Sequence, residues 1–468
     1  MKTILAFLLV AAATAPAQQV KLPPFTRLTL PNGATLLLMP RQDAPLVTLR
    51  AAFKGGAEAS DPAKAGLAPL VAELLRRGTA TRSGEKFSEE VDALGAAFNT
   101  YASRQSLVIE SEFLARSTAP ALALFADAIL HPTFPEDELK KALAQRIDRA
   151  KAAKDNPGAA INGFHEAFFY GPTHDYGLPL NGDETTLPKI TRADVLEFHK
   201  RNFSGANLIL IAAGAFDPKT LAPELEKLFA ALPKGQPHTW KMDNAPARPA
   251  QNRLLLVDKP DATQTYFQIS QPGITRKTPD WPTLWLLNTL FGGRFTSMLN
   301  DELRVNSGLT YGANSLLTRD RRTGRISITT YTRTDTTEKA IDLALDILKR
   351  LNEKGITADQ LASAKAYLKG TFPPRSLETA DQLAEVLEDL ELYNLNRGEI
   401  DDLFSRLDAV TLDQANAAAK KYYQTQGLVF TLLGNAANIR DVARKYAPQI
   451  IEVPITTPGY QVPSQPVK

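Results

Sequence analysis

The chain has 468 residues, of which 44% are hydrophobic, and this length predicts two to four domains rather than one. Its 54 basic residues nearly balance its 51 acidic residues, and no basic stripe with interleaved aromatic residues is present, so no nucleic-acid partner is expected. The absence of cysteine excludes disulfides, thiolate metal sites and a lipidated cysteine anchor.

The first residues have the pattern of a Sec-type signal peptide. Lys2 is followed by an apolar run from Ile4 to Ala13 and then by Ala15-Pro16-Ala17. We therefore expect residues 1–17 to be cleaved off and the mature protein to be periplasmic. The apolar run is too short for a stable membrane span, and a retained N-terminal anchor is the alternative.

Two long regions of alternating strand and helix patterns follow, separated by a polar linker. Residues 25–235 begin with a hairpin pattern around Pro31-Asn32-Gly33 and form the first predicted domain. Residues 236–251, rich in Pro, Asn and charge, are the predicted linker. Residues 252–453 form the second domain, and the Pro-rich tail 454–468 is expected to lie extended. The charged run Arg319–Arg322 beside a predicted turn is expected to be solvated surface.

The two domains repeat one another weakly. Residues 203–214 and 423–434 are both strand patterns that end in glycine and precede a helix pattern. Residues 119–130 and 338–351 are both amphipathic helix patterns, and each is followed by a second helix. The sequence therefore predicts an α+β fold, a tandem duplicate in which each largely antiparallel sheet has helices packed on one face. Coincidence among common patterns is the alternative.

The stretch from Gly66 to Thr79, GLAPLVAELLRRGT, predicts an amphipathic helix with Gly78 near its C-terminal end. A catalytic zinc ion needs about three protein ligands, and two histidines on one helix face are an economical source of two of them. The chain has five histidines, and no two of them lie three to five residues apart. The residues therefore predict no helix-borne metal site. Pro69 has no backbone N–H and must lie in the first turn of its helix or distort it.

The chain from about Phe25 to Val453 resembles the M16 (pitrilysin-like, inverzincin) metallopeptidases, specifically the short two-subunit bacterial type. It keeps Gly66-Leu67-Ala68 and Gly78-Thr79 at the spacing of that family's active helix. The two zinc histidines of the family fall on Pro69 and Glu73, and its general-base glutamate falls on Ala72. Its third zinc ligand falls near Arg149, with Asp148 and Ala150 as neighbouring registers. The resemblance thus implies a degenerate zinc motif and no metal in this chain.

A second motif is similar to the Arg/Tyr pair of the non-zinc subunits in this family. In Phe291-Gly-Gly-Arg…Leu303-Arg304…Gly308-Leu-Thr-Tyr311, Arg304 and Tyr311 match the pair at the family spacing. A tyrosine hydroxyl that donates to the scissile carbonyl oxygen stabilises the charge that builds up there during hydrolysis. In the alternative structural interpretation, Arg304 caps the C-terminal carbonyls of a helix over residues 295–305 and Tyr311 fills the sheet edge.

The resemblance also implies substrate-binding positions. The family follows its active helix with a strand that pairs with substrate backbone, and here that strand carries Asn99 and Tyr101. The family's Thr and acidic positions are Ala102 and Gln105 in this chain, and an ordinary sheet strand is the alternative. Gly292 and Gly293 belong to the second motif and are further candidates for substrate binding.

The resemblance implies the following function. The chain is expected to be the zinc-lacking Arg/Tyr subunit of a heterodimeric M16 peptidase that acts on short unfolded peptides. A partner bearing His-x-x-Glu-His would supply the zinc, and this chain would not be active alone. The alternative is a non-enzymatic M16-fold scaffold or a peptide-binding assembly component.

Overall fold

The computed structural model describes residues 20–171, 174–241 and 246–463. The predicted signal peptide therefore lies outside the described residues, as do parts of the predicted linker and tail. No helix among the described residues combines the length and the apolarity needed to cross a membrane.

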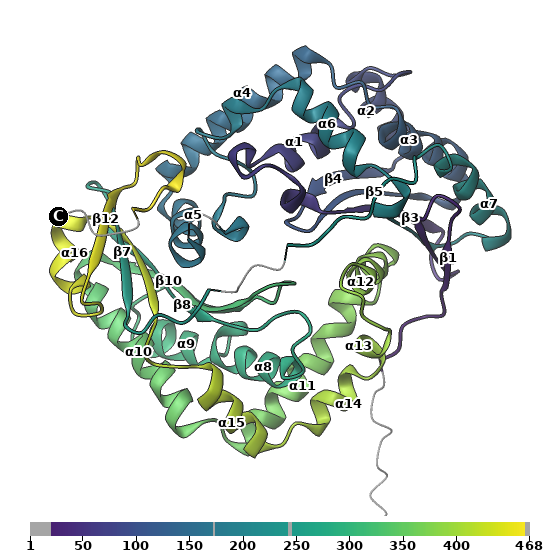
Figure 1. Ribbon diagram of the computed structural model, residues 1–468. Coiled ribbons are helices and arrows are strands. Elements are labelled where there is room, and N and C mark those ends of the chain that lie inside the picture. Colours follow the sequence, from purple (N-terminus) through teal and green to yellow (C-terminus); the bar gives the residue numbers. More distant parts are fainter. Residues whose placement is uncertain (1–19, 172–173, 242–245, 464–468) are drawn as a thin grey trace, which may run out of the picture.

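The two halves form two six-stranded sheets (Figure 1) in which five strands follow the same plan. The sixth is the first strand of its half and antiparallel in one sheet, and the last strand of its half and parallel in the other. The orders are β1-β2-β6-β3-β5-β4 and β12-β7-β11-β8-β10-β9. The strands are β1 (Thr26–Thr29), β2 (Thr35–Pro40), β3 (Leu46–Lys54), β4 (Ala97–Ala102), β5 (Ser106–Leu114), β6 (Leu208–Gly214), β7 (Arg253–Asp258), β8 (Gln264–Pro272), β9 (Ala313–Leu317), β10 (Arg325–Arg333), β11 (Val429–Gly434) and β12 (Ile450–Pro454). Most neighbours are antiparallel, whereas β2–β6, β7–β11 and β7–β12 are parallel. The predicted α+β duplication is confirmed.

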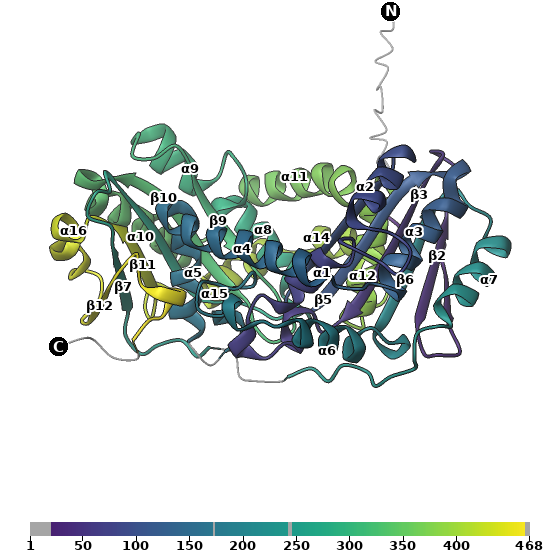
Figure 2. The same cartoon turned by 90° about the horizontal axis from the view of Figure 1, so that it is seen from above.

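The helices surround both sheets (Figures 1 and 2). Those of the first half are α1 (Leu67–Leu74), α2 (Gly84–Ala93), α3 (Thr118–Leu130), α4 (Glu136–Ala152), α5 (Pro157–Tyr170), α6 (Arg192–Asn202) and α7 (Pro218–Phe229). Those of the second are α8 (Trp281–Asn288), α9 (Met298–Asn300), α10 (Thr337–Lys354), α11 (Ala358–Ser376), α12 (Ala380–Leu392), α13 (Gly398–Asp401), α14 (Leu403–Ala409), α15 (Leu412–Tyr422) and α16 (Ala436–Ala443). Two π-helical turns, η8 (Thr289–Gly293) and η9 (Asp301–Asn306), flank α9.

One helix of each half packs on the sheet of the other half. Helix α12 packs on β3 and β6, where Leu383 and Leu387 share a core with Ile209 and Ile211. Helix α5 packs on β7, β8 and β11, and its apolar side chains share a core with those strands. The other face of each sheet carries helices of its own half, as the sequence predicts. The exchanged helices, which cover the second faces, were not predicted.

The ends of the described chain join the two halves further. Leu22 donates its N–H to the Asp401 carboxylate at 2.8 Å, which ties the N-terminal segment to the second half. The tail, expected to be extended, instead forms a short turn at Pro458–Tyr460. The buried ring of Tyr460 packs edge to face on Phe164 of α5.

Candidate functional site

The degenerate motif lies on α1, beside the edge strand β4. Pro69 is buried in the first turn of the helix, where a backbone N–H would have no intrahelical acceptor. Ala72 is also buried, and Glu73 is half-buried. The helix therefore forms normally around the proline, but it presents one carboxylate where a metal site would need several ligands.

A guanidinium group occupies the space between α1 and α4. The Nε of Arg146 donates to Oε2 of Glu73 at 2.9 Å, and its Nη2 donates to the carbonyl of Pro69 at 2.9 Å. The other oxygen of Glu73 accepts from Arg77 at 3.1 Å. Arg149, the position aligned with the third zinc ligand, is exposed on the same helix. Arg146 lies three residues before it on the same helix, but helical spacing alone does not show that it contacts Glu73, which is 73 residues away in the sequence.

These residues do not fit a zinc ion. Pro69 and Ala72 carry no ligand atom, and both oxygens of Glu73 accept hydrogen bonds from arginines. In the part of the chain that the structure describes, no group of three or more His, Cys, Asp or Glu is placed to hold a metal ion. The buried histidines have structural contacts instead. His165 of α5, for example, lies 2.9 Å from Thr431 Oγ1 and 2.6 Å from Ser270 Oγ, and burial lowers its pKa well below 6.5.

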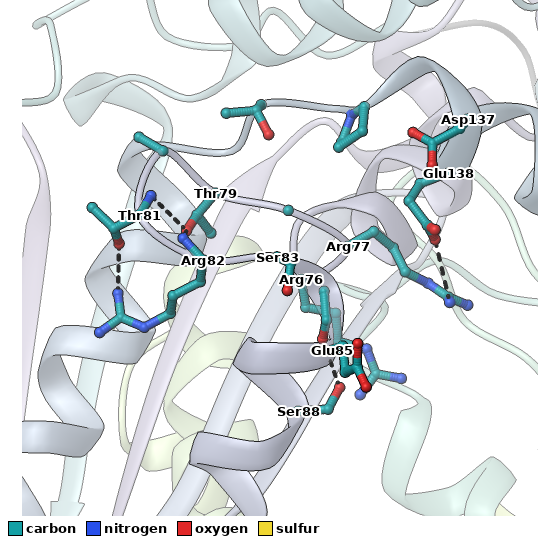
Figure 3. Close-up of a pocket in the computed structure, with 15 residues that line it drawn as sticks. Arg76, Arg77, Thr79, Thr81, Arg82, Ser83, Glu85, Ser88, Asp137 and Glu138 are labelled. Atoms are coloured by element: carbon teal, nitrogen blue, oxygen red, sulfur yellow. Dashed lines mark hydrogen bonds and ion pairs between the residues drawn. The ribbon is translucent and has the colours of Figure 1, made fainter.

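A cavity of about 910 Å³ opens beside the C-terminal end of α1 (Figure 3). Its wall includes the loop over residues 76–85 and the start of α4. Two of its arginines are engaged within the chain: Arg77 pairs with Glu138 at 3.7 Å, and Arg82 pairs with Asp127 at 2.7 Å. These ion pairs brace the loop.

The predicted substrate strand is β4, which forms the free edge of the first sheet. It pairs with β5 and has no strand on its other side among the described residues. Asn99 and Tyr101 are both exposed and, two residues apart, lie on the same face. Although Tyr101 is 42% exposed as a whole, its hydroxyl end lies against Arg50, from which it accepts at 2.5 Å, and the partial burial of that end raises the pKa of Tyr101 to about 12. This tyrosine is therefore a neutral, fixed group beside an open edge.

The equivalent edge of the second sheet, β9, is closed by side chains from the preceding segment. Asn300 accepts from the Ala313 N–H at 2.9 Å, and Asn288 donates to the Ser315 carbonyl at 3.0 Å. Gly292 is buried against this edge, where a Cβ atom would lie 2.3 Å from the Ser315 nitrogen. Gly293 is exposed. The structure thus gives Gly292 a packing role, and its predicted contact with substrate stays a prediction.

Arg304 lies in η9, and Tyr311 lies in the loop after it, two residues before the start of β9. The carbonyls at the end of η9 accept backbone N–H groups: Arg304 from Gly308 at 3.1 Å, and Leu303 from Leu309 at 2.9 Å. The Arg304 guanidinium lies 4.6 Å from the ring centre of Phe295, and no hydrogen bond from it to a helix carbonyl occurs among the described residues. The structure therefore contradicts the capping role that the alternative interpretation gives to Arg304.

Tyr311 does not fill the sheet edge either, because its side chain is 81% exposed. The backbone around it is held in place: Thr330 Oγ1 donates to the Gly312 carbonyl at 2.8 Å, and the Gly312 N–H donates to Thr310 at 3.2 Å. Phe295, Val305 and Leu316 are also exposed, at 64%, 65% and 49%. An anchored loop therefore presents an uncovered apolar surface with an arginine and a tyrosine in it.

The charged run Arg319–Arg322 is not solvated surface as expected. The Arg322 side chain is fully buried and pairs with Asp175 of the first half at 3.1 Å. Arg319 pairs with Glu399 at 3.2 Å, and its guanidinium lies 3.4 Å from the ring centre of Trp281. The prediction was wrong because the partners of these arginines come from distant parts of the chain.

Comparison with known proteins identifies the fold. The family model for insulinase (peptidase family M16) matches residues 37–176, and the model for the peptidase M16 inactive domain matches residues 189–368. The chain belongs to the M16 peptidase family. The predicted resemblance is thereby confirmed.

Solved structures and curated relatives agree with this assignment. A crystal structure of a peptidase M16 inactive domain from Pseudomonas fluorescens is 28% identical, with a TM-score of 0.82 over 88% of this chain and 98% of that one. A protease from Helicobacter pylori shares the fold at 19% identity, with a TM-score of 0.78 over 88% of this chain and all of that one. An uncharacterised zinc protease, YmxG, from Bacillus subtilis is 23% identical over 88% of this chain and 99% of its own length.

Proposed function

We propose that this chain is the zinc-lacking Arg/Tyr subunit of a heterodimeric M16 peptidase that acts on short unfolded peptides. A partner bearing His-x-x-Glu-His would supply the zinc site. In this proposal the peptide pairs along β4, and Tyr311 donates a hydrogen bond to the scissile carbonyl oxygen in the partner's site. The Arg304 guanidinium, which is always charged, holds a neighbouring substrate carbonyl or orients the tyrosine. The predicted export would make the complex periplasmic.

The observation that carries this proposal is the exposure of Tyr311. A large aromatic side chain that is 81% exposed on an anchored loop contributes little to the fold of its own chain. With the caps of η9 supplied by backbone groups, Arg304 is not needed for helix termination either. Both side chains are thus available for a group outside this chain, which supports a shared active site over a purely structural role.

The test is reconstitution. The purified chain is mixed with an M16 homologue that carries an intact His-x-x-Glu-His motif, encoded in a neighbouring reading frame, and cleavage of quenched fluorescent peptides is followed. Neither chain alone should cut, and the mixture should. Tyr311→Phe should lower kcat about 100- to 1000-fold, because it removes one oxyanion donor. Tyr331→Phe, a tyrosine of β10 that stacks on Tyr266, is the matched control and should keep full activity.

The scaffold alternative makes the opposite prediction. If the reconstituted complex keeps full activity with the double variant Tyr311→Phe, Arg304→Ala, these side chains take no part in hydrolysis. The chain would then be an M16-fold scaffold or a peptide-binding component.

A further inference from the structure

A second cavity, of about 680 Å³, lies between the two halves and adjoins β4. Tyr101 and Ser103 line it from the first half, and residues of α8, α11 and α12 line it from the second. It is separate from the cavity of Figure 3, which adjoins the end of α1. Its position beside Tyr101 connects it with the open edge of the first sheet.

One wall of this cavity is aromatic. The rings of Trp281 and Trp285 stack with their centres 5.3 Å apart, and Phe372 packs edge to face on Trp285 at 5.6 Å. All three side chains are half-buried. The Arg319 guanidinium covers one face of Trp281, so the ring surface open to the cavity belongs mainly to Trp285 and Phe372. A wall of this kind favours an apolar or aromatic ligand group, which would remove the remaining ring surface from water.

The buried charged groups in the lining are already paired with one another. Arg50 donates to Glu388 at 2.6 Å, and Arg276 and Arg319 donate to Glu399 at 3.0 and 3.2 Å. A charged ligand group would have to break one of these pairs or enter without a counter-ion, and both are costly. Arg375 and Glu385, which also line the cavity, are exposed, and an ion pair between a ligand and either of them would contribute little to binding. The half-buried aromatic rings are therefore the surface from which a ligand gains most.

Strand geometry connects this wall with a bound peptide. A peptide that pairs along the free edge of β4 places alternate side chains on the face that carries Asn99 and Tyr101. Because Tyr101 lines the cavity, a side chain beside it on that face is directed to the same space. We propose that this cavity is a specificity pocket for one large apolar, preferably aromatic, side chain of a peptide paired along β4. This proposal rests on the proposed function and names the class of peptide that the complex selects.

Tryptophan fluorescence tests the proposal directly, because two of the three tryptophans line the cavity. The full chain carrying Trp240→Phe is titrated with capped eight-residue peptides of Ser and Thr that have one central Phe, Leu, Ala or Glu. The Phe peptide should change the emission and bind about tenfold more tightly than the Ala peptide, as expected for burial of one aromatic side chain. The Glu peptide should bind no better than the Ala peptide.

Two variants assign the preference to the cavity. Phe372→Ala removes part of the wall, and Ser376→Phe fills the space from the end of α11; each should reduce the preference for Phe over Ala to about twofold or less. Tyr331→Ala, which removes an aromatic ring outside the cavity, should leave the preference unchanged. Circular dichroism of each variant confirms that it is folded.

Equal affinity for the Phe and Ala peptides, no binding of any peptide, or a preference that survives both cavity variants would overturn the proposal. Kinetics of the reconstituted complex separate this failure from failure of the proposed function. If the preference is absent while Tyr311→Phe still lowers kcat, the proposed pocket is wrong and the shared active site stands. If Tyr311→Phe has no effect, the proposed function itself is wrong.

Discussion

Strands β4 and β9 occupy equivalent edges of the two sheets, yet the edge of β4 is largely open and that of β9 is closed. Asn288 and Asn300 bond to the backbone of β9, and Gly292 lets the chain pack against it. At β4 no strand lies on the outer side among the described residues, and Arg76 donates to the outward-facing Phe98 carbonyl at 3.3 Å, a longer bond than those at β9. The halves of this duplicated fold thus differ in what they expose: one keeps the edge of β4 free of a neighbouring strand, and the other presents the loop with Arg304 and Tyr311. This difference is the one that the proposed function requires.

We expect the largest effect on stability from a substitution at Gly292, which packs against the closed edge of β9. In Gly292→Ala the new Cβ would lie 2.3 Å from the Ser315 nitrogen, so the segment over η8 must move off β9. We expect a loss of about 3 kcal/mol in the free energy of unfolding, measured by urea denaturation. Gly293→Ala, whose Cβ would have its nearest contact at 3.0 Å in an exposed position, should cost clearly less. Equal losses would contradict the packing role of Gly292.

In the first half, the next largest effect is expected when the Arg146 contact that links α1 to α4 is removed. Arg146→Met removes the hydrogen bonds to Glu73 and to the Pro69 carbonyl, both at 2.9 Å. It should destabilise the chain by about 2 kcal/mol, because half-buried charged groups lose a partner. Arg149→Met, three residues further along the same helix and exposed, should change stability by less than about 0.5 kcal/mol. Similar effects of the two variants would mean that Arg146 is not the link between the helices.

A smaller effect is expected when one bond of the closed edge is removed. Asn300→Ala leaves the Ala313 N–H without its acceptor and should cost about 1 kcal/mol. Hydrogen exchange of the β9 amides should become faster in the same variant. Asn314→Ala changes an exposed asparagine of β9 itself and serves as the control, with no expected increase in exchange. Unchanged exchange in Asn300→Ala would show that the edge is closed by other means.

The smallest effect concerns pH and the contact between the halves. Burial lowers the pKa of His165, so below about pH 6.5 the unfolded chain binds a proton that the folded chain excludes. The stabilisation from this neutral histidine is present above that pH and is lost as the pH falls. His165→Gln should therefore reduce the fall in melting temperature between pH 7 and pH 5. Parallel pH profiles of the two proteins would contradict this role.

Much of this molecule could be predicted locally. The repeated strand and helix patterns predict the two sheets, and Pro69, Ala72 and Glu73 predict the missing ligand set. The contacts that were missed are long-range ones. Arg322 and Asp175 are 147 residues apart in the sequence, and no local pattern shows that one buries the other. The same holds for the exchange of α5 and α12, whose apolar faces look alike whichever sheet they cover.

The exchange of α5 and α12 also constrains how the protein is made. Until residues 380–392 have been synthesised, one face of the first sheet, including Ile209 and Ile211, has no cover. The N-terminal half therefore cannot bury this apolar face, and cannot complete its fold, before residues 380–392 are present. For the same reason, a protease nick in the linker should leave the mature halves interlocked rather than release two independent fragments.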